Sequence, residues 1–134
     1  MKKISPNHLC PCGSNVKYKK CCLKYHKGAF ASTALLLMKS RYSAYAVGDS
    51  AYIMKTTHSN NSDFTENTEG WKKSIDDFSF HTDFLALEIL EFLEGKEESF
   101  VTFKAKLSTG EMIEKSRFLK LGSVWLYEQG VIEE

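Results

Sequence analysis

All four cysteines of the chain lie within thirteen residues near its N-terminus, as Cys10, Cys12 and the adjacent pair Cys21 and Cys22. Thiolates with this C-x-C-x₈-C-C spacing are typical ligands of one tetrahedral metal ion, and soft, closed thiolate shells prefer zinc. His26 follows Cys22 by four residues, about one helical turn, so it could replace one cysteine. Because four protein ligands leave no position for water, the spacing predicts a structural Zn²⁺. Disulfides or free thiols are the remaining alternatives.

The residues around the cysteines are basic. Residues 1–48 contain nine lysines and arginines and no aspartate or glutamate, although the net charge of the whole chain is only +1. Such a segment indicates an acidic partner, either a protein surface or RNA at the ribosome, with contact to the acidic second half of the chain as the alternative. Interleaved Tyr18 and Tyr25 would suit stacking on single-stranded bases. The predicted interaction surface consists of Lys17, Tyr18, Lys19, Lys20, Lys24 and Lys27.

The length and composition of the chain limit the kind of protein that can contain this site. With 134 residues, 43% of them hydrophobic, the chain can form one domain with its own core and a small appendage. It has no run of about 20 apolar residues that could span a membrane, and its charged N-terminus leads into no apolar signal segment. Clustered cysteines in such a chain indicate reduced thiols, and we therefore expect a cytoplasmic protein.

The site must be positioned by two dissimilar segments. Residues 1–28 have too few apolar side chains for a core, so we expect them to fold only with metal. The following residues predict a helix with one apolar stripe, capped by Ser32 or Thr33 and ended by Gly48. A shorter helix is predicted from Asp49 to about Thr57, and another around 71–75. The stripe consists of Ala31, Leu35, Met38, Tyr42 and Tyr45.

The second half of the chain shows the alternation of strands. Strands are predicted over 84–93, 101–107, 112–121 and 124–128, joined by short turns that contain Gly95, Gly110 and Gly122. Helices followed by a curved antiparallel sheet indicate the α+β class.

The cysteine segment resembles a known motif. Cys10-Pro11-Cys12-Gly13-Ser14, followed by Lys17-Tyr18-Lys19-Lys20-Cys21-Cys22, is similar to the SEC-C motif, the zinc knuckle at the C-terminus of the translocase ATPase SecA. In that motif the last two ligands are Cys followed by Cys or His, so the resemblance favours Cys22 over His26. The motif usually has glycine where Asn15 stands, and asparagine tolerates the same left-handed backbone. Since the motif of SecA binds an acidic chaperone, the resemblance implies an acidic protein partner.

The rest of the chain contains several segments that are typical of one family. They are Arg41-Tyr42-Ser43-Ala44-Tyr45, Thr56-x-His58, Trp71, Glu114-Lys115-Ser116-Arg117-Phe118 and Gly122-x-x-Trp125-x-Tyr127-x-x-Gly130. Through these segments the chain resembles the YchJ family of bacterial proteins. The resemblance implies a fold like that of nuclear transport factor two, in which helices lie across a curved antiparallel sheet to form a cone. The predicted organisation is therefore a SEC-C zinc knuckle over residues 1–28 and a YchJ-like middle domain over 29–134.

A cone of this shape often encloses a pocket, which gives a second candidate function. A carboxylate and a histidine in an apolar pocket could do acid–base work, so a small-molecule-binding protein or enzyme that uses Glu114, Arg41 and His58 is the alternative. The plainer alternative is that Arg41 and Glu114 pair with each other inside a filled core. The sequence has no nucleophile elbow, phosphate loop or dinucleotide fingerprint. We therefore expect a zinc-binding adaptor, without catalytic residues. The candidate pocket residues are Arg41, Tyr45, His58, Trp71, Glu114 and Ser116.

Overall fold

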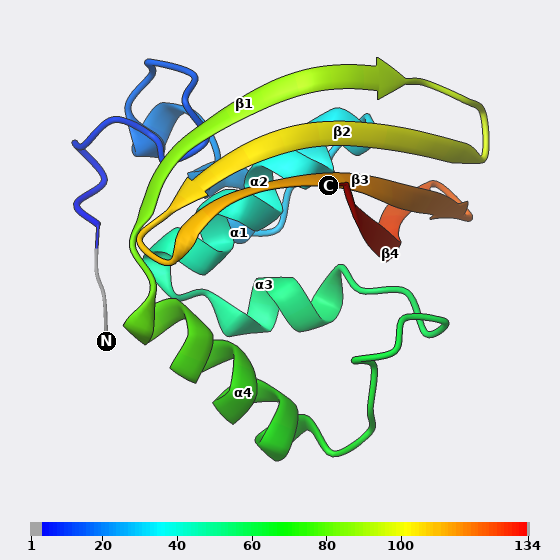
Figure 1. The fold of residues 1–134 in the computed structure, drawn as a ribbon. Helices are drawn as coiled ribbons and strands as arrows, with labels where there is room; N and C mark the ends of the chain where they lie inside the picture. Colours follow the sequence, from blue (N-terminus) through cyan, green and yellow to red (C-terminus); the bar gives the residue numbers. More distant parts are fainter. Residues whose placement is uncertain (1–3, 134) are drawn as a thin grey trace.

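The computed structural model describes residues 4–133 and places helices against a four-stranded antiparallel sheet (Figure 1). This arrangement confirms the predicted α+β class. We call residues 4–28 the knuckle and residues 29–133 the cone domain. The elements in chain order are the 3₁₀-helix η1 (Tyr18–Lys20), the helices α1 (Leu23–His26), α2 (Ala34–Val47), α3 (Ser50–Lys55) and α4 (Thr68–His81), and the strands β1 (Phe84–Leu93), β2 (Glu98–Leu107), β3 (Gly110–Leu121) and β4 (Val124–Glu133).

The helices of the cone domain begin and end where the capping residues predict. The side chain of Thr33 accepts a hydrogen bond from the backbone N–H of Leu36 at the start of α2, and Gly48 ends the helix with a left-handed φ of 84°. Asp49 caps α3 in the same way. Helix α4, which the sequence predicted only over 71–75, runs further because Asn67 caps its start, and its buried line continues to the polar Ser79.

Helix α2 differs from the prediction of a single apolar stripe. It is buried on most of its circumference, because the cone domain covers one side and the knuckle covers another (Figure 1). A helix enclosed in this way needs small residues that let neighbouring segments approach, and small residues hide an amphipathic pattern. Its buried residues are Ala34, Leu37, Met38, Ser40, Arg41, Tyr42, Ser43, Ala44 and Ala46.

The sheet is an antiparallel meander of order β1-β2-β3-β4. Its strands lie over α2. The middle of β1 lies on the side of the sheet that is away from α4 (Figure 1). Strand β4 continues to Glu133, beyond the predicted end at residue 128. The β3–β4 register shifts between Arg117 and Phe118, because Phe118 pairs with Tyr127 whereas Arg117 pairs with Gln129. Glu128 is thus the additional residue of a β-bulge.

The core lies between the sheet and the helices. Phe118, Ile53 and Val101 are among its most deeply buried large side chains, each 1% exposed or less. Over residues 4–133, the helices are too short or too polar to cross a membrane.

Candidate functional site

Two short backbone turns bring the cysteines together. Leu9 and Lys17 form an antiparallel bridge, and the backbone N–H of Cys10 donates to the carbonyl oxygen of Val16 at 2.8 Å. The loop between them turns through left-handed conformations at Gly13 (φ 84°) and Asn15 (φ 64°). These are residue types that adopt positive φ at low cost. The loop therefore directs Cys10 and Cys12 inward.

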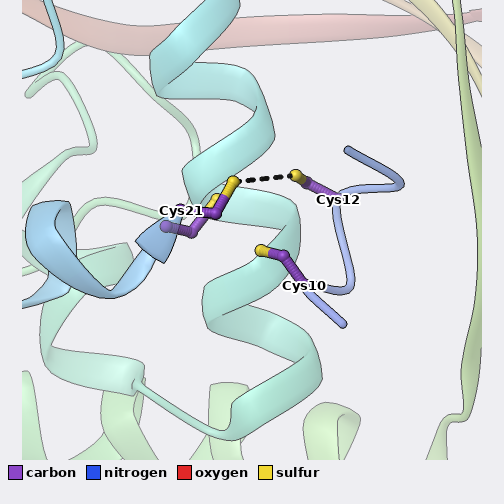
Figure 2. A group of neighbouring side chains, drawn as sticks. Cys10, Cys12 and Cys21 are labelled. Carbon is purple, nitrogen blue, oxygen red and sulfur yellow. Dashed lines mark hydrogen bonds between the residues drawn. The ribbon is translucent and has the colours of Figure 1, made fainter. Parts of the chain in front are cut away.

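The second pair of cysteines enters from the other side. Cys21 ends η1, and Cys22 precedes the first residue of α1. The side chains of adjacent residues usually diverge. The change of backbone direction between η1 and α1 lets the side chains of Cys21 and Cys22 reach the same cluster. Figure 2 shows the labelled sulfurs of Cys10, Cys12 and Cys21 turned toward one another beside α2.

The four sulfurs fit one metal ion. All four lie within 4.8 Å of one another, and the Sγ atoms of Cys12 and Cys21 are 3.6 Å apart. A tetrahedron with Zn–S bonds of about 2.3 Å has edges of about 3.8 Å, whereas a disulfide requires about 2.05 Å. All four cysteines are free. The group is therefore a cluster of four thiols that could hold a metal ion, and it contains no disulfide.

Hydroxyl groups from two segments support the sulfurs. Ser14 Oγ lies 3.2 Å from Cys21 Sγ, and Ser43 Oγ of α2 lies 3.4 Å from Cys10 Sγ. Such outer contacts orient metal ligands and stabilise negative charge on sulfur. Ser43 is a contact that analysis of the sequence alone missed, although it lies inside the Arg41–Tyr45 segment on which the family resemblance rests.

The thiols of the cluster affect one another's ionisation. Hydrogen bonds from Cys12, Cys22 and Ser43 hold the pKa of Cys10 far below its usual value. The contact with Cys10 raises the pKa of Cys12 to about 11 and raises that of Cys22 as well. The close approach of the sulfurs therefore couples the ionisation of the thiols, so that negative charge on one disfavours charge on its neighbours. A cation that replaced the thiol protons would be held by four thiolates.

His26, the alternative ligand, lies outside the sulfur cluster. Its Nδ1 is hydrogen bonded to the hydroxyl of Tyr18, and its Nε2 lies 2.8 Å from the carbonyl oxygen of Ser40 in α2. Both ring nitrogens therefore have partners within the protein. The imidazole also contacts the ring of Tyr52 at 4.8 Å between centroids. His26 thus connects the knuckle to α2 and α3.

The predicted interaction surface is only partly exposed. Tyr18 is 6% exposed and Tyr25 is 8% exposed, so neither ring can stack on a base. The sequence misplaced them because an aromatic residue between lysines has the same pattern whether it faces solvent or the core. The exposed members of the surface are Lys17, Lys19, Lys20, Lys24 and Lys27.

The knuckle packs directly on the cone domain. Val47 of α2 and Leu87 of β1 pack against the buried cluster that its cysteines form with Tyr18. A Cβ atom at Gly13 would lie 3.4 Å from the carbonyl oxygen of Leu87, which shows how closely the loop approaches the strand. The boundary at residue 28 stays a prediction, since the two parts share these contacts.

The cone domain contains a cavity of about 230 Å³. Of the candidate pocket residues, Arg41, Tyr45, Glu114 and Ser116 line it. His58 and Trp71 do not: His58 is held beside β4 by a backbone hydrogen bond to Tyr127, and Trp71 packs against Phe64. His58 lies in the segment between α3 and α4, and Trp71 lies in the first turn of α4, where it is part of the buried core.

Arg41 and Glu114 line the same cavity but have separate partners. Arg41 Nη1 donates to the backbone oxygen of Ile53 and to the hydroxyls of Thr56 and Thr57, at 2.8–3.1 Å. Its guanidinium also lies over the ring of Tyr127, 4.6 Å from the centroid. Within residues 4–133, it forms no ion pair with Glu114. The expected direct pairing is absent because three oxygens of α3 and its C-terminal end already hold the guanidinium.

Glu114 is held by hydroxyl groups. Its Oε2 accepts hydrogen bonds from Ser116 Oγ at 2.6 Å and from Tyr127 Oη at 3.1 Å. Burial raises the pKa of Tyr127, and the negative charge of Glu114 adds to this effect, so the phenol keeps its proton and donates it. Gly130 leaves the space for this carboxylate, since a Cβ there would lie 2.1 Å from Oε2. Tyr127 and Gly130 belong to the segment over 122–130 that carries the family resemblance. That resemblance was the sequence signal that could have identified both residues.

Comparisons with known proteins agree with this architecture. The family described as "YchJ, middle NTF2-like domain" matches residues 33–130, and the SEC-C motif matches residues 7–24. The chain is 36% identical over 129 residues to a UPF0225 protein of Streptomyces coelicolor, covering 93% of this chain and 96% of the relative. It is 39% identical over 131 residues to a UPF0225 protein of Serratia proteamaculans, covering 91% and 82%.

Two solved structures have the same fold over nearly the whole chain. The solution structure of a SEC-C motif containing protein from Rhodopseudomonas palustris has a TM-score of 0.78 at 28% identity, covering 95% of this chain and 100% of that one. The crystal structure of a SEC-C motif containing protein from Psychrobacter arcticus has a TM-score of 0.76 at 28% identity, covering 96% and 85%. The chain therefore belongs to the UPF0225 (YchJ-like) family and carries a SEC-C motif ahead of the family's NTF2-like middle domain.

Proposed function

We propose that this protein is a zinc-dependent interaction protein whose knuckle binds an acidic protein surface. The observation that carries the proposal is the position of exposed lysines on the segment that the four-thiol cluster holds in place. Zinc is the ion that fits a closed shell of four thiolates, and its role here is structural. The reduced thiols that it needs are typical of the cytoplasm.

The metal would contribute what the knuckle lacks in apolar packing. The sulfur cluster and Tyr18 form a small core of their own, separate from the large core of the cone domain. Zinc bound to finger-sized peptides contributes on the order of 10–16 kcal/mol. Its ligands would hold the two turns of the knuckle together, and with them the lysines on its surface.

The composition of the knuckle surface favours protein over RNA. Since Tyr18 and Tyr25 are buried, the knuckle does not offer them as stacking platforms for unpaired bases. Leu9 is 61% exposed and Val16 42% exposed, and Leu9 lies opposite Lys17 in the antiparallel bridge. Apolar side chains surrounded by charged ones are typical of the centre and rim of a protein interface. The partner surface would then carry carboxylates around an apolar residue.

The test compares two variants with the same change of charge. One is Lys19→Gln/Lys20→Gln/Lys24→Gln in the knuckle, and the other, also at exposed lysines, is Lys55→Gln/Lys96→Gln/Lys106→Gln in the cone domain. Each immobilised protein is incubated with cell extract, with and without ribonuclease, and the retained proteins are quantified by mass spectrometry over a salt series.

We expect the wild type and the cone-domain variant to retain the same acidic proteins, and the knuckle variant to lose them. Retention should weaken steeply with salt, because charged surfaces are screened. Cys21→Ser/Cys22→Ser and zinc chelation should abolish it. Retention that survives zinc removal would contradict the proposal, and retention that ribonuclease abolishes would replace the protein partner by RNA.

A further inference from the structure

The cavity of the cone domain is independent of the knuckle's proposed role. It lies between α2, α4 and the inner face of β2, β3 and β4, on the side of α2 that holds Met38 and Tyr42. Phe78 lines it and is itself 44% exposed, so the cavity reaches solvent beside α4. A cavity of about 150 Å³ with apolar walls binds benzene. The 230 Å³ here leave room for a ring with several further atoms.

Aromatic rings form much of the wall. Phe78 and Phe84 meet edge to face at 5.7 Å between centroids, and Tyr45 contacts both of them. On the opposite side, the ring of Phe118 lies 5.7 Å from that of Tyr127. Rings arranged in this way offer both faces and edges to a planar guest, and aromatic pairs favour such offset or edge-on contacts.

The polar end of the cavity has one acceptor left over. Both hydroxyl donors of Glu114, from Ser116 and Tyr127, go to Oε2. Among residues 4–133, no donor is hydrogen bonded to Oε1. Glu114 is only half-buried, and Oε1 is not among the fully buried atoms of the described residues that lack a partner, so water can reach it and a guest's donor would take the place of that water. The two hydroxyls therefore fix the carboxylate in a pose that leaves one oxygen available to a guest.

The negative charge of Glu114 does not require a positively charged guest. Arg41 lines the same cavity and supplies a positive charge that the threonine hydroxyls and the Tyr127 ring hold in place. The two charges offset each other across the cavity. A neutral guest would therefore enter at lower desolvation cost than an ion.

We infer that this cavity binds a small, neutral, planar aromatic molecule that donates one N–H or O–H hydrogen bond to Glu114. The ring would lie among Tyr45, Phe78, Phe84 and Phe118, and the donor group would replace water at Oε1. This binding site does not depend on zinc or on the lysines of the knuckle. Its failure would leave the proposed interaction role untouched.

Indole and benzothiophene test the inference as a matched pair of probes. Both are fused bicyclic rings of nearly the same shape, but only indole has an N–H donor. Each is titrated into the intact zinc-loaded protein, and binding is followed by chemical-shift changes in ¹H–¹⁵N spectra. We expect indole to bind with a dissociation constant on the order of 1 mM or below, and to bind about tenfold more tightly than benzothiophene. The shifts should centre on Ser116, Phe118 and Tyr127.

Glu114→Gln is the decisive variant. The hydroxyls of Ser116 and Tyr127 would hold the amide oxygen, which places the amide NH₂ group where Oε1 now lies. A donor would then face a donor, so indole binding should fall about tenfold, while benzothiophene binding should change less than about twofold. Ala105→Val, at a cavity-lining residue that is 2% exposed, should weaken both probes by reducing the space.

Three results would overturn the inference. One is that neither probe binds at about 5 mM. Another is that the shifts lie outside the cavity. The third is that Glu114→Gln leaves the ratio of the two affinities unchanged. The ¹H–¹⁵N spectrum of each variant without probe shows whether its fold is intact, so that Glu114→Gln remains informative even if Ala105→Val does not fold.

Discussion

The knuckle and the cone domain share the helix α2 but are stabilised by different means. In the knuckle, three of the most buried side chains are cysteines, and its order depends on where four sulfurs point. In the cone domain, large apolar side chains such as Phe118 and Ile53 fill the space between sheet and helices. A small segment can therefore be folded by ligand geometry, whereas a larger one uses buried area. Changes at the metal site and changes in the apolar core should therefore affect different parts of the molecule.

Removal of the metal should have the largest effect, and it should affect only the knuckle. We expect chelation of zinc, or Cys21→Ser/Cys22→Ser, to abolish the dispersed amide signals of the knuckle, because its ligands contribute on the order of 10 kcal/mol or more. The signals of β2 and β3 should remain dispersed. A cone domain that unfolds together with the knuckle in ¹H–¹⁵N spectra would show that the two parts form one cooperative unit.

Phe118→Ala perturbs the core of the cone domain and leaves the metal ligands unchanged. This side chain is 1% exposed in the core of the cone domain, and removing it should lower the free energy of unfolding by about 3–5 kcal/mol. Zinc affinity of the protein that remains folded should change less than about twofold, since Phe118 belongs to the core of the cone domain and the sulfurs belong to the separate cluster of the knuckle. Urea denaturation gives the first quantity, and competition with a chromophoric chelator gives the second. A large loss of zinc affinity would contradict the separation.

Gly130→Ala tests a close approach inside the cone domain. A Cβ would lie 2.1 Å from Glu114 Oε2, so the carboxylate would have to move, and we expect a loss of about 1–3 kcal/mol in stability by urea denaturation. In a Glu114→Ala background the same change should cost less, since the two nearest clashing atoms are gone and Tyr127 Oη, at 2.7 Å, remains. Equal costs in both backgrounds would show that Glu114 does not fill this space.

Ser43→Ala should have the smallest effect, because it removes only a hydroxyl of α2 that contacts a sulfur and leaves all four sulfurs in place. Ser43 lies 3.4 Å from Cys10 Sγ, and loss of such an outer contact typically weakens metal binding about tenfold. Ser40→Ala is the matched control, since its hydroxyl is bonded to Tyr52 and Leu37. Zinc competition should distinguish the two variants, and equal affinities would mean that Ser43 does not act on the metal.

Much of the fold could be predicted because its signals are local. Thr33, Gly48 and Asp49 set the ends of α2 and the start of α3, and capping depends on neighbouring residues only. The cysteine cluster was equally accessible, since metal-ligand residue types at short spacing along the chain are typical of one metal site. The strand pattern of the second half predicted the meander for the same reason.

The sequence failed where distant segments meet. The knuckle covers a second side of α2, and no pattern within the helix could reveal that cover. Tyr18 is directed inward to His26, although it lies in a run of lysines. His58 was expected among the residues of the pocket, but its position is set by a backbone hydrogen bond to Tyr127 of β4. Each of these depends on contacts between residues remote in sequence.

The bulge at Glu128 has a consequence for how the chain can change length. In a regular strand, residues three positions apart such as Tyr127 and Gly130 would face opposite sides, because side chains alternate. The additional residue lets both lie on the inner face, where they meet Glu114. Loss of Glu128 would turn the bulge into a regular ladder and keep Tyr127 and Gly130 on one face, whereas a further residue inserted into the regular ladder would reverse one of them. Relatives that retain this carboxylate site should therefore lose the bulge residue between Trp125 and Gly130 more readily than they gain another.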